Sequence, residues 1–198
     1  MQLKLYSVFM YNDCERGVIM DKIKLGIIGI GAQGGGYAKH LISGAAPEIS
    51  LTAVCDSDHA KLEAFKKEYG DIVHTFDNYK DLIKSGEVNS VLIAVPHYDH
   101  CIIAVDSFIE GLNVLVEKPA GVFTGDVESM NAAAEKSGKV FSIMYNQRTN
   151  PVYIKVRQLV KSGQLGDIKR VSWTITDWYR PQAYHDSSDW RSKWSTEG

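Results

Sequence analysis

An acidic and a basic side chain stand together where an apolar run ends in VEKPAG. Glu117 and Lys118 follow the run LNVLV, and Pro119 comes directly after them. Charged residues at such a point usually mark only where a buried strand meets water. A lysine beside a nicotinamide ring can also hydrogen-bond a substrate hydroxyl and stabilise the alkoxide during hydride transfer. We therefore expect Lys118 to be catalytic and Pro119 to fix the turn, with a cis bond as one way of doing so.

A second chemical signal is the glycine-rich stretch GIGAQGGG. Gly29, Gly31 and Gly34 form the pattern G-x-G-x-x-G between an apolar run and a predicted helix. In that context the first glycine allows a tight turn, the second lets a pyrophosphate approach, and the third lets helix and strand pack closely. With Ala32 and Gln33 between them, they form a predicted cofactor loop that points helix N–H groups at the phosphates. The alternative is a glycine-rich turn without a ligand.

Asp56 ends the next apolar run, 22 residues after Gly34, close to where a ribose-binding carboxylate is expected. The alternative is a helix cap or a solvated turn residue, a role that Ser57 or Asp58 could fill equally well. A carboxylate at this point repels a 2′-phosphate, and no arginine or lysine follows it before Lys61. We therefore expect NAD, with NADP less favoured.

The stretch VPHYDH carries two histidines and an aspartate after another apolar run. His97, Asp99 and His100 could suggest a metal site, but the spacing offers no third ligand downstream. We expect no metal, and a cofactor-lining loop that includes Pro96, His97 and His100, with His100 in the first turn of the following helix.

These residues can act together only if a sheet brings the ends of its strands to one edge, and the sequence pattern predicts such a sheet. Strands are expected over 23–31, 50–56, 71–76, 90–96, 112–119 and 139–145, and helices over 33–44, 58–70, 78–86, 98–110 and 124–138. Regular alternation at short intervals is typical of a parallel sheet covered by helices on both faces. The predicted fold class is α/β, a doubly wound Rossmann sheet.

After Asn146 the pattern changes. Residues 150–166 read as a helix with Pro151 in its first turn, and residues 167–180 alternate as a half-exposed antiparallel strand does. We expect three parts: an N-terminal extension over 1–21, an NAD(P)-binding domain over 22–142, and the start of an α+β substrate and dimerisation domain over 143–198. The first 20 residues make a poor signal peptide; a short extra strand and an upstream extension before Met20 fit equally well.

The composition argues against nucleic acid and membranes as binding partners. The 198 residues carry a formal net charge of −2, so no basic field attracts nucleic acid or anionic lipid. No apolar run approaches the roughly 18 residues of a membrane span. The three cysteines are scattered, and Cys55 and Cys101 lie in apolar runs, which favours reduced buried thiols in a cytoplasmic protein.

Taken together, these motifs resemble the family of glucose–fructose oxidoreductase, inositol dehydrogenase and MocA-like oxidoreductases. The similarity covers about residues 22 to 198 and rests on GIIGIGAQG, VPHYDH, VEKPAG, YNQRTNP, DWYRP and DWRSKW in combination. Members have an N-terminal NAD(P)-binding domain and a C-terminal domain with an open sheet, and mostly oxidise or reduce hydroxyls of sugars and cyclitols.

The resemblance assigns roles to individual residues. It implies that Lys118 is the catalytic lysine, that Glu117 lies against the cofactor, and that Asn146 and Gln147 lie close to the nicotinamide. It also implies a set of substrate-pocket candidates, for whose aromatic members packing is an equally good reading: Arg148, Trp178, Tyr179, Trp190 and Arg191.

One departure from the family pattern affects the expected function. Members carry a further segment with an aspartate or similar residue and a histidine that completes a proton relay with the lysine. The sequence stops at WSTEG, and His185 lies too early to replace that histidine. We expect either a fragment or a truncated gene product. The main hypothesis is an NAD(P)-dependent sugar or cyclitol oxidoreductase that forms homo-oligomers through its completed C-terminal sheet; the alternative is a non-catalytic cofactor-binding sensor or scaffold, or an inactive fragment.

Overall fold

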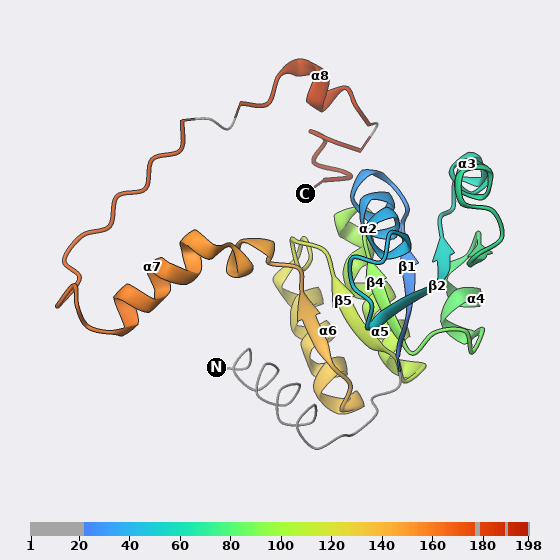
Figure 1. The fold of residues 1–198 in the computed structure, drawn as a ribbon, viewed down its shortest axis with the longest axis horizontal. Helices are drawn as coiled ribbons and strands as arrows, with labels where there is room; N and C mark the ends of the chain where they lie inside the picture. Colours follow the sequence, from blue (N-terminus) through green and yellow to red (C-terminus); the bar gives the residue numbers. More distant parts are fainter. Residues whose placement is uncertain (1–21, 177–178, 189, 198) are drawn as a thin grey trace.

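The computed structural model describes residues 22–176, 179–188 and 190–197. Its centre is a parallel sheet of six strands in the order β3-β2-β1-β4-β5-β6 (Figure 1). The strands are β1 (Ile23–Ile28), β2 (Ile49–Cys55), β3 (His74–Phe76), β4 (Ser90–Ile93), β5 (Asn113–Val116) and β6 (Phe141–Ile143). This is the doubly wound Rossmann arrangement that the alternation of elements predicts.

Helices cover both faces of the sheet. One face packs against α2 (Ala32–Ile42) and α3 (His59–Tyr69) through a core that includes Ile27, Val54 and Phe65. The other face packs against α4 (Tyr79–Lys84), α5 (His100–Ile109) and α6 (Thr124–Ser137). β1 from Leu25 to Ile28 and all of β4 are buried, and apart from Ser90 these residues are apolar; Lys24, near the start of β1, is exposed.

The predicted ends of α3 are confirmed. The Asp58 carboxylate accepts the backbone N–H of Ala60 at 2.9 Å, which satisfies one of the free donors of the first turn. Gly70 ends the helix with a φ of 69°, a conformation that favours glycine.

Several predicted elements are shorter than expected. β3 begins at His74 rather than at residue 71, and β6 spans only Phe141–Ile143. Both are edge strands, so they pair on one side only. The helix predicted to start at residue 98 begins at His100, after a 3-10 turn over His97–Asp99.

The predicted antiparallel strand over 167–180 is wrong for its described residues. Residues 167–176 contain no strand, and they run away from the sheet after α7 (Pro151–Lys161), whose first turn holds the expected proline (Figure 1). A strand needs a neighbour for its backbone N–H and C=O groups, and in the described part of the chain this segment has none. A short helix that was not predicted, α8 (Gln182–His185), follows.

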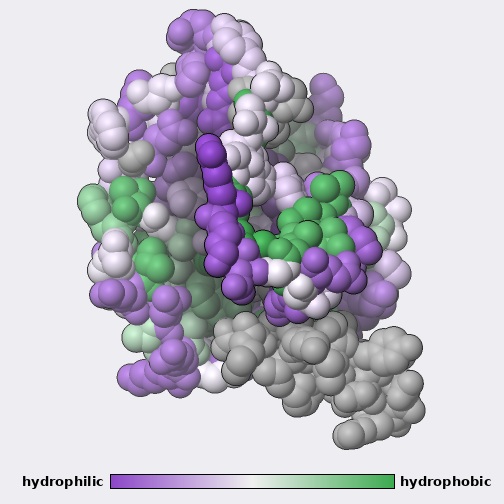
Figure 2. Space-filling model, turned by 90° about the vertical axis from the view of Figure 1, so that its left-hand side faces the viewer, coloured by the Kyte–Doolittle hydropathy of each residue, from purple (hydrophilic) through white to green (hydrophobic). Residues whose placement is uncertain are grey.

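Many apolar side chains in this C-terminal part are exposed. Figure 2 views the molecule from the side on which α7 lies and shows hydrophobic side chains among polar ones. The exposed apolar residues here include Val152, Val156, Val160, Val171, Trp173 and Ile175. The core clusters contain no residue beyond Met144, so only the Rossmann part has an internal hydrophobic core among the described residues.

The two cysteines among the described residues are buried, as expected. Cys55 and Cys101 are buried and free, and burial raises the pKa of the Cys55 thiol to about 12. The expected N-terminal extension and Cys14 lie outside the described residues. Within the described residues, no helix is both long and apolar enough to cross a membrane.

Candidate functional site

The predicted site residues meet at one edge of the sheet. In a parallel sheet every strand ends at the same edge, and a crevice opens where the strand order reverses direction. Here the reversal falls between β1 and β4. Gly29 follows β1, Asp56 follows β2 and Glu117 follows β5, so all three lie at the carboxyl ends of their strands.

Two positions of the glycine loop, Gly29 and Gly34, require glycine for steric reasons. Gly29 has a φ of 90°, and a Cβ placed there would lie 2.5 Å from the carbonyl oxygen of Ala94. Its N–H donates to Cys55 O at 2.7 Å, which ties the turn to β2. A Cβ on Gly34 would lie 1.8 Å from the carbonyl oxygen of Gly29, so only glycine lets α2 start this close to β1.

The start of α2 has the features of an anion site. Gly31 is the N-cap and offers no side-chain oxygen to the free N–H groups of the first turn. The first turn contains no acidic residue, so the positive end of the helix dipole is not neutralised locally. A Cβ on Gly31 would meet nothing within 4 Å, and the neighbouring Ala32 and Gln33 are exposed. These residues fit a pyrophosphate.

Asp56 is buried, and its carboxylate already has several partners. One oxygen accepts the N–H of Ile30 and the other the N–H of Asp58, both at 3.0 Å. The Lys61 ammonium lies 3.2 Å from the same carboxylate. Asp58, not Asp56, caps α3, so the cap alternative for Asp56 is excluded. In the sequence Lys61 is the first basic residue after Asp56, and the first turn of α3 brings it back to the Asp56 carboxylate.

The Glu117–Pro119 turn separates a buried acid from an exposed base. Glu117 is 6% exposed; its carboxylate accepts the Tyr37 hydroxyl and, through the other oxygen, the N–H of Lys118 at 3.0 Å. Lys118 is exposed, and within the described residues it forms no ion pair. The Lys118–Pro119 peptide bond is cis, in line with the expected turn.

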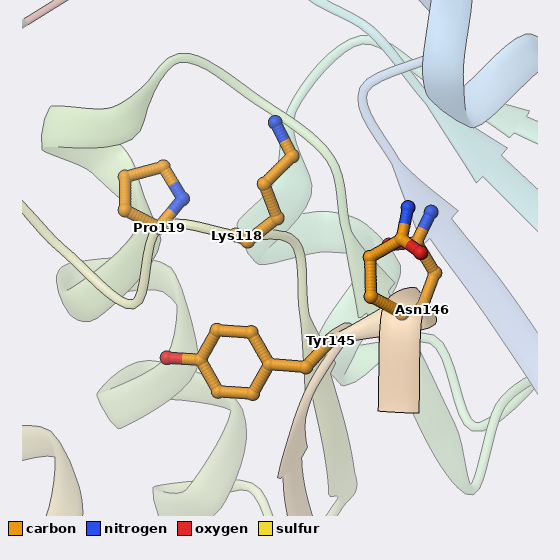
Figure 3. A pocket seen from close by; sticks show the side chains of 5 residues that line it. Lys118, Pro119, Tyr145 and Asn146 are labelled. Atoms are coloured by element: carbon orange, nitrogen blue, oxygen red, sulfur yellow. The ribbon is translucent and has the colours of Figure 1, made fainter. Parts of the chain in front are cut away.

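Lys118 lies at a cavity of about 380 Å³ beside this turn. The cavity is lined by Lys118, Pro119, Tyr145, Asn146 and Gln147. In Figure 3 the Tyr145 ring lies below Pro119 and extends to the left, whereas the side chains of Lys118 and Asn146 extend toward the top of the view. The structure therefore brings Lys118 together with Asn146 and Gln147, which come from a separate segment of the chain. All three were expected near the nicotinamide.

The loop after β4 has two differently placed histidines. His97 is half-buried, whereas the ring of His100 is fully buried below Pro119. The His100 ring nitrogens lie 2.8 Å from Pro119 O and 2.9 Å from Val95 O. Burial lowers the pKa of His100, against the opposite effect of these carbonyls. The His100 ring thus contacts the backbone on both sides of it, and its expected place at the cofactor stays a prediction. Among the described residues no three His, Cys, Asp or Glu side chains are grouped as a metal site.

The expected substrate residues are only partly brought to the site. Arg148 lies over the Tyr145 ring at 5.6 Å, next to the cavity. The Trp190 ring lies 5.2 Å from that of His97, and the Arg191 guanidinium lies 4.7 Å from the Trp190 ring. Tyr179 is 85% exposed and has no place in the cavity. Trp178 lies outside the described residues.

Three residues near the site were not predicted from the sequence: Tyr37, Lys61 and Tyr145. Lys61 could have been noticed, because it lies five residues after Asp56 at the start of a predicted helix. Tyr145 precedes the predicted Asn146 and Gln147 directly. Nothing in the sequence pairs Tyr37 with Glu117, since 80 positions separate them.

Comparison with known proteins agrees with this geometry. Residues 23–145 match the family whose description is "Oxidoreductase family, NAD-binding Rossmann fold", and whose name combines Gfo, Idh and MocA. The match covers the sheet, the glycine loop and the Glu117–Pro119 turn, and it ends at the cavity residue Tyr145.

Two curated relatives illustrate the range of the family. A 1-carboxy-3-chloro-3,4-dihydroxycyclohexa-1,5-diene dehydrogenase of Comamonas testosteroni is 31% identical over 137 residues, which is 68% of this chain and 34% of that protein. The scyllo-inositol 2-dehydrogenase (NADP(+)) IolW of Bacillus subtilis is 26% identical over 182 residues, 89% of this chain and 47% of that protein. The chain thus spans less than half the length of these relatives.

A solved structure shows the same arrangement. The scyllo-inositol dehydrogenase of Lactobacillus casei, crystallised with NAD(H) and scyllo-inositol, superimposes with a TM-score of 0.69 at 27% identity. The superposition covers 74% of this chain and 43% of the other.

Proposed function

Because this chain belongs to the Gfo/Idh/MocA oxidoreductase family with its NAD-binding Rossmann fold, we propose that it forms the cofactor-binding part of an NAD-dependent dehydrogenase. The proposed substrate is a sugar or cyclitol, and the reaction moves hydride between the nicotinamide and a CH–OH group. The observation that carries this proposal is the position of Lys118, on the cavity and at the same sheet edge as the glycine loop.

Each group of residues has a separate task in this proposal. The N–H groups at the start of α2 hold the pyrophosphate, and the Asp56 carboxylate accepts a ribose hydroxyl. The nicotinamide, when bound, supplies or accepts the hydride. The Lys118 side chain hydrogen-bonds the substrate oxygen: in the reduction its ammonium gives a proton to the oxygen as hydride arrives at the carbon, and in the oxidation its neutral amine takes the hydroxyl proton as hydride leaves. Asn146 and Gln147 line the cavity in which nicotinamide and substrate would meet.

Binding of NADH to this chain tests the cofactor part directly. We expect the fluorescence of NADH to change on titration with the protein, with saturation at one site per chain. Turnover is then measured on the full gene product with inositols, glucose and related polyols by the formation of NADH. Absence of NADH binding would refute the cofactor site, whereas binding without turnover on any polyol would support a sensor or scaffold.

Asp56 predicts a preference between cofactors. A carboxylate beside the ribose repels a 2′-phosphate, and each 1.4 kcal/mol of such discrimination is a factor of about ten in affinity. We expect NAD(H) to bind at least about tenfold more tightly than NADP(H). Asp56→Asn keeps an acceptor for Ile30 N–H but removes the charge and releases the Lys61 ammonium to the phosphate. This variant should bring the two affinities within about threefold of each other.

Calorimetric titration of both cofactors measures the preference. Asp71→Ala is the matched control, because it removes an exposed carboxylate outside the site and should leave the ratio unchanged. Equal or tighter binding of NADP(H) by the unmutated protein would contradict the assignment of Asp56.

A further inference from the structure

The turn that carries Lys118 is held from three separate elements. Glu117 N–H donates to Ile93 O at the end of β4, at 2.8 Å. Pro119 O faces the buried His100 ring of α5. The third support comes from α2, where Tyr37 donates its hydroxyl to the Glu117 carboxylate.

The support from Tyr37 is connected to Lys118 through the Glu117 carboxylate. The Glu117 carboxylate uses one oxygen for the Tyr37 hydroxyl and the other for the backbone N–H of Lys118. Both bonds lie in an environment where Glu117 is nearly inaccessible to water. A buried carboxylate that loses a donor is left with an unsatisfied oxygen, which is costly, so the two bonds depend on each other.

Tyr37 is suited to hold this bond at any ordinary pH. Burial, and then the hydrogen bond and charge of Glu117, raise the pKa of Tyr37 well above its usual value, so the hydroxyl keeps its proton. The ring also packs against the core below α2, so phenylalanine can replace the ring and remove only the hydroxyl.

These two hydrogen bonds form a Tyr37–Glu117–Lys118 bridge, which joins two parts of the site with different tasks. Tyr37 lies on the helix whose first turn fits the pyrophosphate, and Lys118 lies at the cavity that Asn146 also lines. We propose that Tyr37 is a positioning residue for Lys118, acting through the Glu117 carboxylate to fix the lysine's turn relative to the cofactor-binding helix α2. The link to catalysis rests on the proposed function, whereas the bridge itself does not.

The bridge is tested in the cofactor-free chain by NMR-detected hydrogen exchange. Tyr37→Phe should speed exchange of the Lys118 amide by on the order of tenfold, because its acceptor loses its second anchor. Tyr79→Phe is the matched control. The Tyr79 hydroxyl donates to Asp106 at 2.8 Å, so this variant also breaks a tyrosine–carboxylate bond, but between α4 and α5. It should leave the Lys118 amide unchanged.

A second variant covers the case in which Tyr37→Phe does not fold. Glu117→Leu removes both acceptor oxygens and leaves an apolar side chain in the buried position, so it should release the Lys118 amide similarly. Unchanged exchange at Lys118 in whichever variants fold, or equal acceleration in Tyr79→Phe, would overturn the proposal.

The catalytic consequence is read separately in the full gene product. Tyr37→Phe should lower kcat by about tenfold or more while KM for NAD stays within about twofold, since the lysine is misplaced but the phosphate site is intact. Tyr79→Phe should change neither constant. Faster Lys118 exchange with an unchanged kcat would leave the bridge as a purely structural contact and refute the positioning role. Absence of turnover in the unmutated gene product would instead refute the proposed function, and the exchange results would still decide whether the bridge exists.

Discussion

Lys118→Ala should lower kcat of the full gene product by about 10²-fold or more, the usual scale for a positioned acid or base. The reason is its location: Lys118 is the lysine that lines the cavity, it is exposed there, and its backbone is held by Glu117. The affinity for NADH should change much less, because the glycine loop and Asp56 lie on other strands. Steady-state kinetics and NADH titration measure the two effects separately.

A matched lysine distinguishes this effect from a general loss of charge. Lys67 is exposed on α3, away from the cavity, and Lys67→Ala should leave both constants unchanged. If Lys118→Ala kept kcat within a factor of about three, the lysine would be structural and its catalytic assignment wrong. A parallel fall in kcat for Lys67→Ala would likewise point away from the site.

The Rossmann part of the fold could be predicted because its signals are local. β4 and the part of β1 from Leu25 onward are buried, so each reads as a short apolar run closed by a turn. Asp58 and Gly70 mark the ends of α3 by capping preferences that involve only their neighbours in sequence. The alternation of such runs with helices then leaves few topologies other than a doubly wound sheet.

The C-terminal part could not be predicted in the same way. The alternation over 167–176 specifies which side of a strand is apolar, but a strand forms only where another strand pairs with it. Pairing is a long-range property, and the described residues provide no partner for this segment. Sequence pattern alone therefore predicted a strand that the structure does not contain.

The same difference between local and long-range signals decides which parts of the site could be predicted. The glycine spacing and the Glu117–Pro119 turn are local signals, and each could be placed at the end of a predicted strand from its neighbours in sequence. The contacts that hold these groups in place are not local. Tyr37 and its partner Glu117 are 80 positions apart, and the His100 ring of α5 contacts Pro119 O. The sequence identified the groups that could do chemistry but not the side chains that hold them.

Three glycine-to-alanine substitutions at the start of α2 should have three different outcomes. At Gly34 a Cβ would lie 1.8 Å from a backbone carbonyl oxygen that cannot move aside, so Gly34→Ala should lower the free energy of unfolding by about 3 kcal/mol or more. At Gly31 a Cβ meets nothing within 4 Å, and φ is −65°, so Gly31→Ala should fold normally. That methyl group would occupy the approach of the pyrophosphate, and NADH affinity should fall by roughly a hundredfold.

Gly36 is the matched control, because it lies within α2 and a Cβ there also meets nothing within 4 Å. Gly36→Ala should raise the free energy of unfolding by about 0.5–1 kcal/mol through helix propensity and leave NADH affinity unchanged. Urea unfolding and NADH fluorescence titration of the three variants measure both quantities. The Gly31 variant is the decisive one, since its side chain is harmless in the protein alone. If it bound NADH as tightly as the unmutated chain, no phosphate would approach the start of α2, and the cofactor would have to lie elsewhere on the sheet edge.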